Sequence, residues 1–449
     1  MLYDEHGTEI FACPNTDGRA RGQADELVTR GAADRIYEIG GDWVSITAPS
    51  RLLWLIQERP DIMASARHFG MLSDWVTYRF TGVFSTDPTC GSSSALFDLG
   101  RRDWSDELAA LVGIDRSLLP PVFECGEIVG TVTADAAAAT GLPFGLPVTV
   151  GGADTQLALH GIGATSERPT IVAGTFWQTA AVVGSPIIDP QRRLRTLCHV
   201  GTDSWMVEGI GFLSGLVMRW FRDALAPDSI STAAQLGTSP FDVIEGWALE
   251  VPRGSNGLVA VMANAMRADD WHHAAPAFVG IDINDPERFG RGAFARSIEE
   301  AAAYVARAHL EILDDLTEGA TTRSGHVDFT GGSSNGRLWP QIIAEVTGLT
   351  TESSIVPEAT SFGAARLAAS AVGARMAPAS AVERSVMPET GAIAEYDAAY
   401  ERWQRVYAAQ TEATTRSGID PLFTPPGGLA HRPFTSPAST RTKQENHHG

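Results

Sequence analysis

The chain has 449 residues, 44% of them hydrophobic, so it can bury a large core and divide into two domains or more. Its formal net charge of −20 argues against nonspecific binding to nucleic acid or to anionic membranes. The single lysine, Lys443, belongs to the polar C-terminal tail. This excludes enzyme classes that need a lysine ammonium in the folded site, and any phosphate chemistry must use backbone amides, arginine or a metal ion.

The sequence shows no sign of export or of membrane insertion. No apolar run approaches the roughly 18 residues that span a bilayer, and the N-terminus has neither a basic region nor an apolar signal core. We therefore expect a cytoplasmic protein. The cysteines are widely spaced and form no CxxC pair, so we interpret them as packing residues: Cys13, Cys90, Cys125 and Cys198.

The N-terminal region predicts a hairpin followed by a polar loop. Residues 2–12 alternate about a turn at residues 4–7, which is typical of a β-hairpin. Asp17 and Arg19 follow in a loop, where they could hydrogen-bond a polyol. An exposed ion pair between the two is an equally good interpretation.

Two helices are predicted next, at residues 51–58, ended by Pro60, and at residues 73–80. We interpret Asp74, at the start of the second helix, as an N-cap in preference to a ligand. An alanine-rich helix is predicted at residues 134–140. Short β runs accompany this helix between Gly126 and Val150, and we expect the boundary between two lobes near residue 150.

The stretch at residues 151–156 places one carboxylate, Asp154, between a strand-like run at residues 147–150 and an apolar run. Glycines let a substrate approach the backbone, and a strand end holds an Asp at the edge of a cleft, which suits a catalytic base. The alternative is that Asp154 only N-caps the following helix.

Two further glycine segments are candidates for anion binding. Residues 170–183 read as two β runs broken at Gly174 and Thr175, a hairpin whose turn could present amides and a hydroxyl to an anion. A strand at residues 326–330 leads into the glycine loop 331–336 and then a helix, and loops of this kind bind phosphates and nucleotides.

The remaining segments predict mainly helices, over residues 215–225, 296–313, 357–370 and 396–413. The segment 296–313 is amphipathic, and the small residues of 357–370 should let that helix pack closely against a neighbour. The adjacent residues Trp271, His272 and His273 invite a metal interpretation, although a surface or packing role fits them better. After Gly418 we expect disorder.

Taken together, these segments resemble the FGGY family of carbohydrate kinases, from about Leu2 to about Gln410. The sequence segments that show the resemblance are residues 15–20, 174–178, 215–223 and 271–276. The resemblance implies an α/β protein of the two-lobed actin-like, ribonuclease-H-like fold. Residues 1–150 would form the rest of the sugar-binding lobe, 151–415 the ATP-binding lobe, and 416–449 a disordered tail.

The resemblance also implies a reaction and its residues. The γ-phosphoryl group of ATP would pass to a primary hydroxyl, with Mg²⁺ bridging the phosphates and Asp154 accepting the hydroxyl proton. The sugar contacts would come from Asp17, Gln156 and Arg19. The nucleotide contacts would come from Gly174, Thr175, Gly331, Gly332, Ser333 and Asn335.

Within the family the likeness is strongest to kinases of the quorum-sensing signal 4,5-dihydroxy-2,3-pentanedione. A pentulose kinase, acting on xylulose or ribulose, is the alternative within the family. The expected partners are therefore a sugar-like molecule and ATP, with neither nucleic acid nor membrane, and a homodimer is possible.

One departure from the family pattern bears on activity. Family members open with an Asp-x-Gly-Thr turn that serves the phosphates and the metal, and this sequence has none; residues 4–8 have the wrong spacing. We therefore expect the first lobe to lack its opening strands. Met1 would then be a misassigned start, or the chain would be a true truncation with little activity, even a silent sugar-binding protein.

Overall fold

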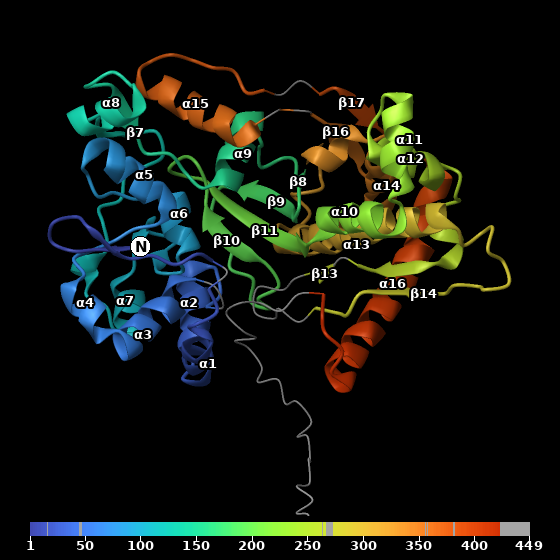
Figure 1. The fold of residues 1–449 in the computed structure, drawn as a ribbon, viewed down its shortest axis with the longest axis horizontal. Coiled ribbons are helices and arrows are strands. Elements are labelled where there is room, and N and C mark those ends of the chain that lie inside the picture. The colour runs from blue at the N-terminus through green and yellow to red at the C-terminus, as the bar shows by residue number, and fades with distance from the viewer. Residues whose placement is uncertain are drawn as a thin grey trace, which may run out of the picture.

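The computed structural model describes residues 1–422, except residues 16, 45–46, 263, 266–272, 355, 357 and 380–381. The chain forms two bodies. The blue-to-teal part of Figure 1 is called the N-terminal lobe (residues 2–149), and the green-to-red part is called the C-terminal lobe (residues 170–417). The segment between them crosses from one lobe to the other.

The N-terminal lobe holds small antiparallel pairings surrounded by helices. Its central sheet has the order β2–β1–β3, with Leu2 opposite both Phe11 and Phe69. The strands are β1 (Leu2–Tyr3), β2 (Glu9–Phe11), β3 (His68–Phe69), β4 (Phe97–Asp98), β5 (Asp103–Trp104), β6 (Ile128–Thr131) and β7 (Pro147–Thr149). The helices are α1 (Arg21–Thr29), α2 (Ala32–Gly40), α3 (Ala48–Glu58), α4 (Pro60–Ser65), α5 (Leu72–Thr81), α6 (Pro88–Ser93), α7 (Asp106–Val112) and α8 (Ala134–Thr140).

The predicted hairpin at the N-terminus is confirmed, because β1 pairs with β2 around a turn that Asp4 stabilises by accepting from the His6 and Thr8 amides, both at 2.9 Å. The N-cap interpretation of Asp74 is wrong by three positions. Met71 is the N-cap of α5, and Asp74, in the first turn, accepts a hydrogen bond from the Met71 amide at 2.7 Å. The Asp74 side chain still stabilises the start of α5, because its hydrogen bond to the N-cap amide is one of the two bonds of a capping box.

The C-terminal lobe is built on one sheet with the order β10–β11–β9–β8–β15–β16–β17, and β13 pairs with β11. The central pairs β8–β15 and β15–β16 are parallel and the others are antiparallel. The strands are β8 (Thr170–Ala173), β9 (Trp177–Val183), β10 (Arg195–Cys198), β11 (Trp205–Phe212), β13 (Asn264–Ala265), β15 (His326–Thr330), β16 (Thr350–Ser353) and β17 (Arg384–Val386). A separate pair joins β12 (Val259–Val261) to β14 (Ala277–Val279).

Helices cover this sheet, and four of the six named next were predicted from the sequence. They are α10 (Ser214–Leu225), α11 (Asp228–Leu236), α12 (Pro240–Leu249), α13 (Arg291–Leu316), α14 (Leu338–Thr347) and α16 (Thr390–Ser417). The helix α13 extends beyond the predicted range 296–313. It is also buried over more than one stripe, since Arg296, Glu299 and Glu300 are each at most 6% exposed. The amphipathic interpretation therefore missed charged groups inside the core.

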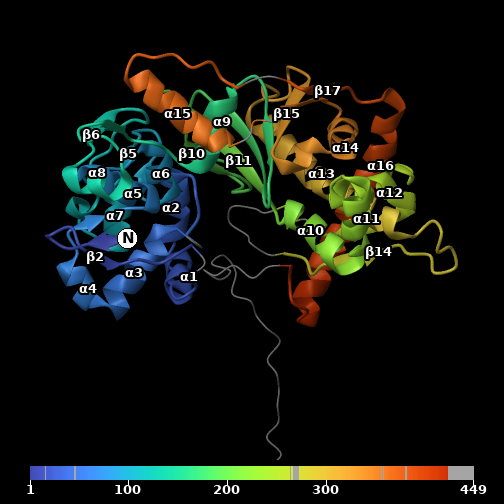
Figure 2. The same cartoon turned by 45° about the horizontal axis from the view of Figure 1, so that its top comes forward.

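Two helices lie above the junction of the lobes, α9 (Asp154–Ile162) and α15 (Ala359–Ala371) (Figures 1 and 2). The predicted close packing of the small-residue helix is confirmed, because a Cβ on Gly363 would lie 1.9 Å from the Leu157 carbonyl oxygen of α9. Cys90 and Cys198 are buried as packing residues, whereas Cys13 and Cys125 are partly exposed. Among the helices of the described residues, none is long and apolar enough to cross a membrane.

Candidate functional site

Asp154 is the first residue of α9, directly after the turn that follows β7. The N-cap position belongs to Ala153, so the interpretation of Asp154 as an N-cap is wrong. The Asp154 side chain is exposed, and its Oδ1 accepts from the amide of Thr155 at 2.7 Å. The carboxylate therefore lies at a helix start where a solute can reach it.

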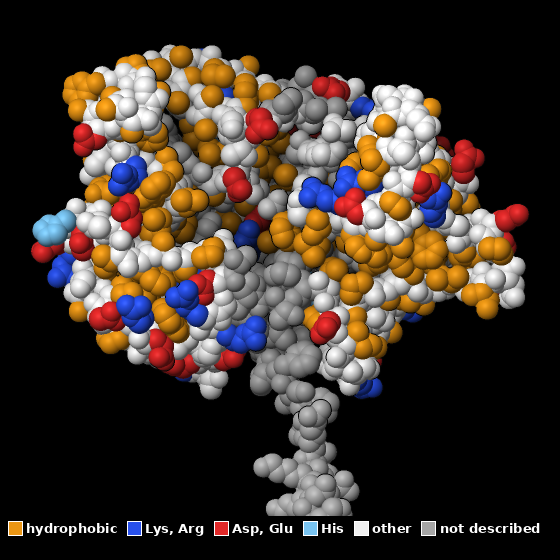
Figure 3. Space-filling view, in the orientation of Figure 1, with side chains coloured by type: hydrophobic (Ala, Val, Ile, Leu, Met, Phe, Trp, Pro, Cys, Tyr) orange, Lys and Arg blue, Asp and Glu red, His pale blue; other side chains and the backbone are white. Residues whose placement is uncertain are grey.

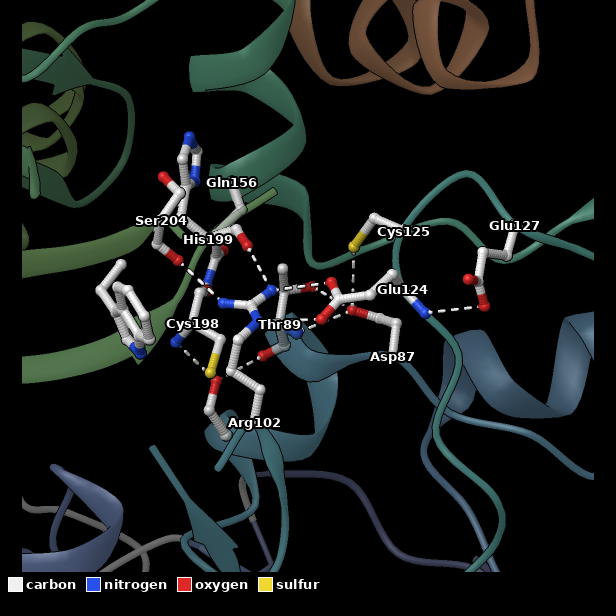
Figure 4. Close-up of polar contacts among 12 residues, drawn as sticks. Asp87, Thr89, Arg102, Glu124, Cys125, Glu127, Gln156, Cys198, His199 and Ser204 are labelled. Atoms are coloured by element: carbon white, nitrogen blue, oxygen red, sulfur yellow. Dashed lines mark hydrogen bonds and ion pairs between the residues drawn. The ribbon is translucent and has the colours of Figure 1, made fainter. Parts of the chain in front are cut away.

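The turn that carries Asp154 is held by a buried network from both lobes, drawn in Figure 4. Thr89 of α6 accepts a hydrogen bond from the Ala153 amide at 2.7 Å, and its hydroxyl donates to Asp87. Asp87 is fixed in turn, because it caps α6 by accepting from the amides of Thr89 at 2.8 Å and Cys90 at 3.1 Å. The backbone before Asp154 is therefore anchored in the N-terminal lobe.

Gln156 belongs to the same network and is only 1% exposed. Its side-chain amide donates to the Cys198 carbonyl oxygen at 3.4 Å, which ties α9 to β10. Below it, the Arg102 guanidinium pairs with Glu124 at 2.8 Å and donates to the Ser204 carbonyl at 2.9 Å, so it also bridges the lobes. These contacts fix the relative position of α6, α9 and the β10–β11 hairpin.

Asp17 and Arg19 form the ion pair that was one of their two interpretations. Asp17 Oδ2 lies 2.7 Å from Arg19 Nη2, and the guanidinium stacks over the rings of Phe11 and Trp54. This pairing lowers the pKa of Asp17. Among the described residues, no hydrogen bond or ion pair joins Asp17 or Arg19 to Asp154 or Gln156.

The two glycine segments meet at one cavity of about 590 Å³ in the C-terminal lobe. Gly174 and Thr175 form the turn of the confirmed β8–β9 hairpin, in which Ala173 lies opposite Trp177. The loop after β15 forms a short 3-10 turn, Gly332–Asn335. Five of the six predicted nucleotide-binding residues line this cavity: Gly174, Thr175, Gly332, Ser333 and Asn335.

The sixth predicted residue, Gly331, is not part of the cavity lining, but it lets the loop approach the hairpin closely. Its φ of +99° is a conformation that glycine adopts easily, and a Cβ there would lie 2.6 Å from the Ala173 carbonyl oxygen. Gly215, at the start of α10, approaches the hairpin even more closely, since its Cβ would lie 1.9 Å from the Gly174 carbonyl oxygen. Only glycine lets the second loop and α10 close around the hairpin turn.

The cavity has further walls that the sequence analysis did not single out. Arg219 of α10 is an exposed cation beside the glycine turns. Phe241 and Glu245 come from α12, and Glu299 comes from the middle of α13. Arg219 lies in a helix that was predicted from the sequence. Because the folded region has no lysine, this arginine could have been noted as a cation for binding phosphate. No sequence signal marks Glu299, because its burial depends on how α12, α13 and α14 pack.

On the face shown in Figure 3, arginine and acidic side chains are interspersed, and the surface is hollowed where the lobes meet.

Within the described residues, no three His, Cys, Asp or Glu side chains are grouped so that they could hold a metal ion. Trp271 and His272 lie outside the described residues, whereas His273 is buried, at 3% exposure.

Comparisons with known proteins identify the family of this chain. The model of the FGGY family of carbohydrate kinases, N-terminal domain, matches residues 7–161, and that of the C-terminal domain matches residues 170–372. Autoinducer-2 kinases of Yersinia pestis (strain Pestoides F) and Yersinia pseudotuberculosis (serotype O:3) are each 37% identical over 420 residues, which cover 91% of this chain and 78% of the relative.

Solved structures show the same fold at lower identity. The xylulose kinase of Rhodospirillum rubrum is 24% identical with a TM-score of 0.79, covering 91% of this chain and 81% of the other. The glycerol kinase of Plasmodium falciparum, solved with ADP, is 18% identical with a TM-score of 0.75, covering 90% and 81%. The two-lobed actin-like fold is thereby confirmed, and with both domain models matched the chain belongs to the FGGY family of carbohydrate kinases, enzymes that transfer a phosphoryl group.

Proposed function

We propose that this carbohydrate kinase transfers the γ-phosphoryl group of ATP to the primary hydroxyl of 4,5-dihydroxy-2,3-pentanedione, the autoinducer-2 of quorum sensing. The observation that carries the proposal is the 37% identity to autoinducer-2 kinases over 91% of the chain. A pentulose acceptor is the rival, since xylulose kinases share the fold. We also propose that the division near residue 150 separates the acceptor-binding lobe from the nucleotide-binding lobe.

In this proposal Asp154 accepts the proton of the attacking hydroxyl. Its support is the exposed carboxylate on a helix start that Thr89 and Gln156 hold in place. Such a base needs rigid placement within hydrogen-bond reach of the hydroxyl, because a misplacement of 1 Å can cost about 100-fold in rate. The burial of Gln156 favours a role in holding α9 over a direct contact with the acceptor.

The nucleotide would lie in the cavity, with its phosphates at the turn of Gly174 and Thr175 and its nucleoside along Gly332, Ser333 and Asn335. Bare amides at such turns suit phosphate oxygens, and Arg219 supplies the positive charge that a lysine supplies elsewhere. Mg²⁺ would bind together with the phosphates of ATP and neutralise their charge during transfer.

The test is ATP consumption with three acceptors, dihydroxypentanedione, D-xylulose and L-ribulose, using this chain and its Asp154→Asn variant. The proposal expects the highest kcat/KM with dihydroxypentanedione, and a loss of turnover in the variant with acceptor binding retained. A preference for D-xylulose or L-ribulose would establish the pentulose kinase instead. Binding of an acceptor without turnover by the unaltered chain would favour the silent sugar-binding protein.

A further inference from the structure

Glu299 is a buried residue that lines the cavity, and one oxygen of its carboxyl group has no hydrogen-bond partner among the described residues. The residue is 4% exposed and lines the cavity from the middle of α13. Within the described part of the chain its Oε2 has no hydrogen-bond partner, although its backbone carbonyl accepts from the Trp339 indole at 3.1 Å. Buried polar atoms are nearly always paired, so an orphaned oxygen at the wall of a cavity calls for an occupant that completes it.

The other acidic groups of the cavity have structural roles. Glu245 accepts from the amides of Arg337 and Leu338, at 2.5 and 2.6 Å, and so caps the start of α14. Asp242 accepts from the Ser239 amide at 3.0 Å in the capping box of α12. Glu299 is therefore the acid of this wall that remains available to a ligand.

The position of Glu299 indicates which part of a nucleotide it meets. Phosphates would be repelled by the carboxylates of Glu245 and Asp242, and they belong at the glycine turn beside Arg219. The wall formed by α12, α13 and α14 also offers Phe241 and Trp339, whose rings suit a planar base. A base placed there brings its edge to Glu299.

The protonation state of Glu299 decides which base fits. Burial raises the pKa of Glu299 well above its usual value; Glu245 and Glu300 add to this shift, and Arg296 opposes it. A neutral carboxyl group has one donor and one acceptor side by side. On the edge that carries N7, adenine presents the complementary pair, the N7 acceptor beside the 6-amino donor, whereas guanine presents two acceptors there, N7 and O6.

We propose that Glu299 selects adenine over guanine nucleotides, with its carboxyl group donating to N7 and accepting from the 6-amino group of the base. This inference rests on the proposed function, because it takes the cavity to hold the nucleotide. It adds a specificity residue on α13, outside the two glycine loops.

The experiment compares ADP and GDP binding by calorimetry in the unaltered chain and in the Glu299→Gln and Glu299→Leu variants. Glutamine keeps a donor beside an acceptor, so Glu299→Gln should bind ADP within about twofold of the unaltered chain. Leucine has neither, so Glu299→Leu should bind ADP about tenfold more weakly, with little change for GDP. Glu311→Gln, a half-exposed carboxylate on the same helix, serves as the control and should change neither affinity.

Urea unfolding separates recognition from a structural role. Without nucleotide, Glu299→Leu should be at least as stable as the unaltered chain, since it removes an unpaired buried carboxyl group. Lower stability in both Glu299 variants would assign the residue a structural role and overturn the inference. Equal affinities for ADP and GDP in the unaltered chain, or ADP affinity unchanged in Glu299→Leu, would overturn it while leaving the kinase function standing. Failure of the unaltered chain to bind either nucleotide would overturn both.

Discussion

Replacing Thr89 by Val should uncouple the helix of Asp154 from the N-terminal lobe. The Thr89 hydroxyl accepts from the Ala153 amide at 2.7 Å and donates to Asp87, and the residue is completely buried. Valine has the same shape, so no cavity forms, but both hydrogen bonds are lost. Serine keeps the hydroxyl and is the matched control.

The size of the effect follows from the Ala153 amide, which is left without its partner. A buried donor or acceptor that loses its partner costs about 1–3 kcal/mol, and the Ala153 amide is the N-cap amide of α9. Asp87 keeps its bonds to the Thr89 and Cys90 amides, so we expect Thr89→Val to lower the free energy of unfolding by about 1–3 kcal/mol. A displacement of α9 by a fraction of an ångström should lower kcat by about 10- to 100-fold.

The assay measures kcat and the KM for ATP in steady state, alongside urea unfolding, for Thr89→Val and Thr89→Ser. A positioning role predicts a lower kcat at an unchanged KM for ATP, because the cavity proposed for the nucleotide lies on other elements, and recovery in Thr89→Ser. If Thr89→Val loses stability but keeps kcat within twofold, Thr89 supports the fold without positioning Asp154, and the reasoning is refuted.

Three further predictions concern other parts of the molecule. Burial raises the pKa of Asp74 from 3.8 to about 7, so the folded protein holds a proton that the unfolded chain releases, and stability falls as pH rises between these values. Between pH 5.5 and 7 the loss should be about 2 kcal/mol in urea unfolding, absent in Asp74→Asn and retained in the control Asp135→Asn; equal pH slopes in all three would contradict it. Gly215→Ala should weaken ADP binding measured by calorimetry at least tenfold, because its Cβ would collide with the hairpin turn, and unchanged affinity would show that α10 can move away. Asp17→Asn should change the free energy of unfolding by less than about 1 kcal/mol, as for a partly exposed ion pair, yet raise the KM for the acceptor if Asp17 binds it; an unchanged KM would leave Asp17 as a partner of Arg19 alone.

The local chemistry of loops and turns could be predicted from the sequence. The break at Gly174 and Thr175 between two β runs predicted the β8–β9 hairpin, and the strand, glycine loop and helix at residues 326–346 were all found. These features depend on neighbouring residues, since turns need glycine and strands need alternating or branched side chains. The N-cap assignments of Asp74 and Asp154 failed because the cap position depends on backbone angles that an acidic residue alone does not fix.

The sequence by itself determined the family, the hairpin turn and glycine loop, and the identity of Asp154 as the candidate base. Only the tertiary structure decided that both glycine segments open onto one cavity, that Thr89 from the other lobe holds the turn before Asp154, and that Glu299 is buried without a partner. The physical reason is the range of the interactions. A turn or a helix start is set within a few residues, whereas burial and desolvation arise where segments distant in sequence pack together.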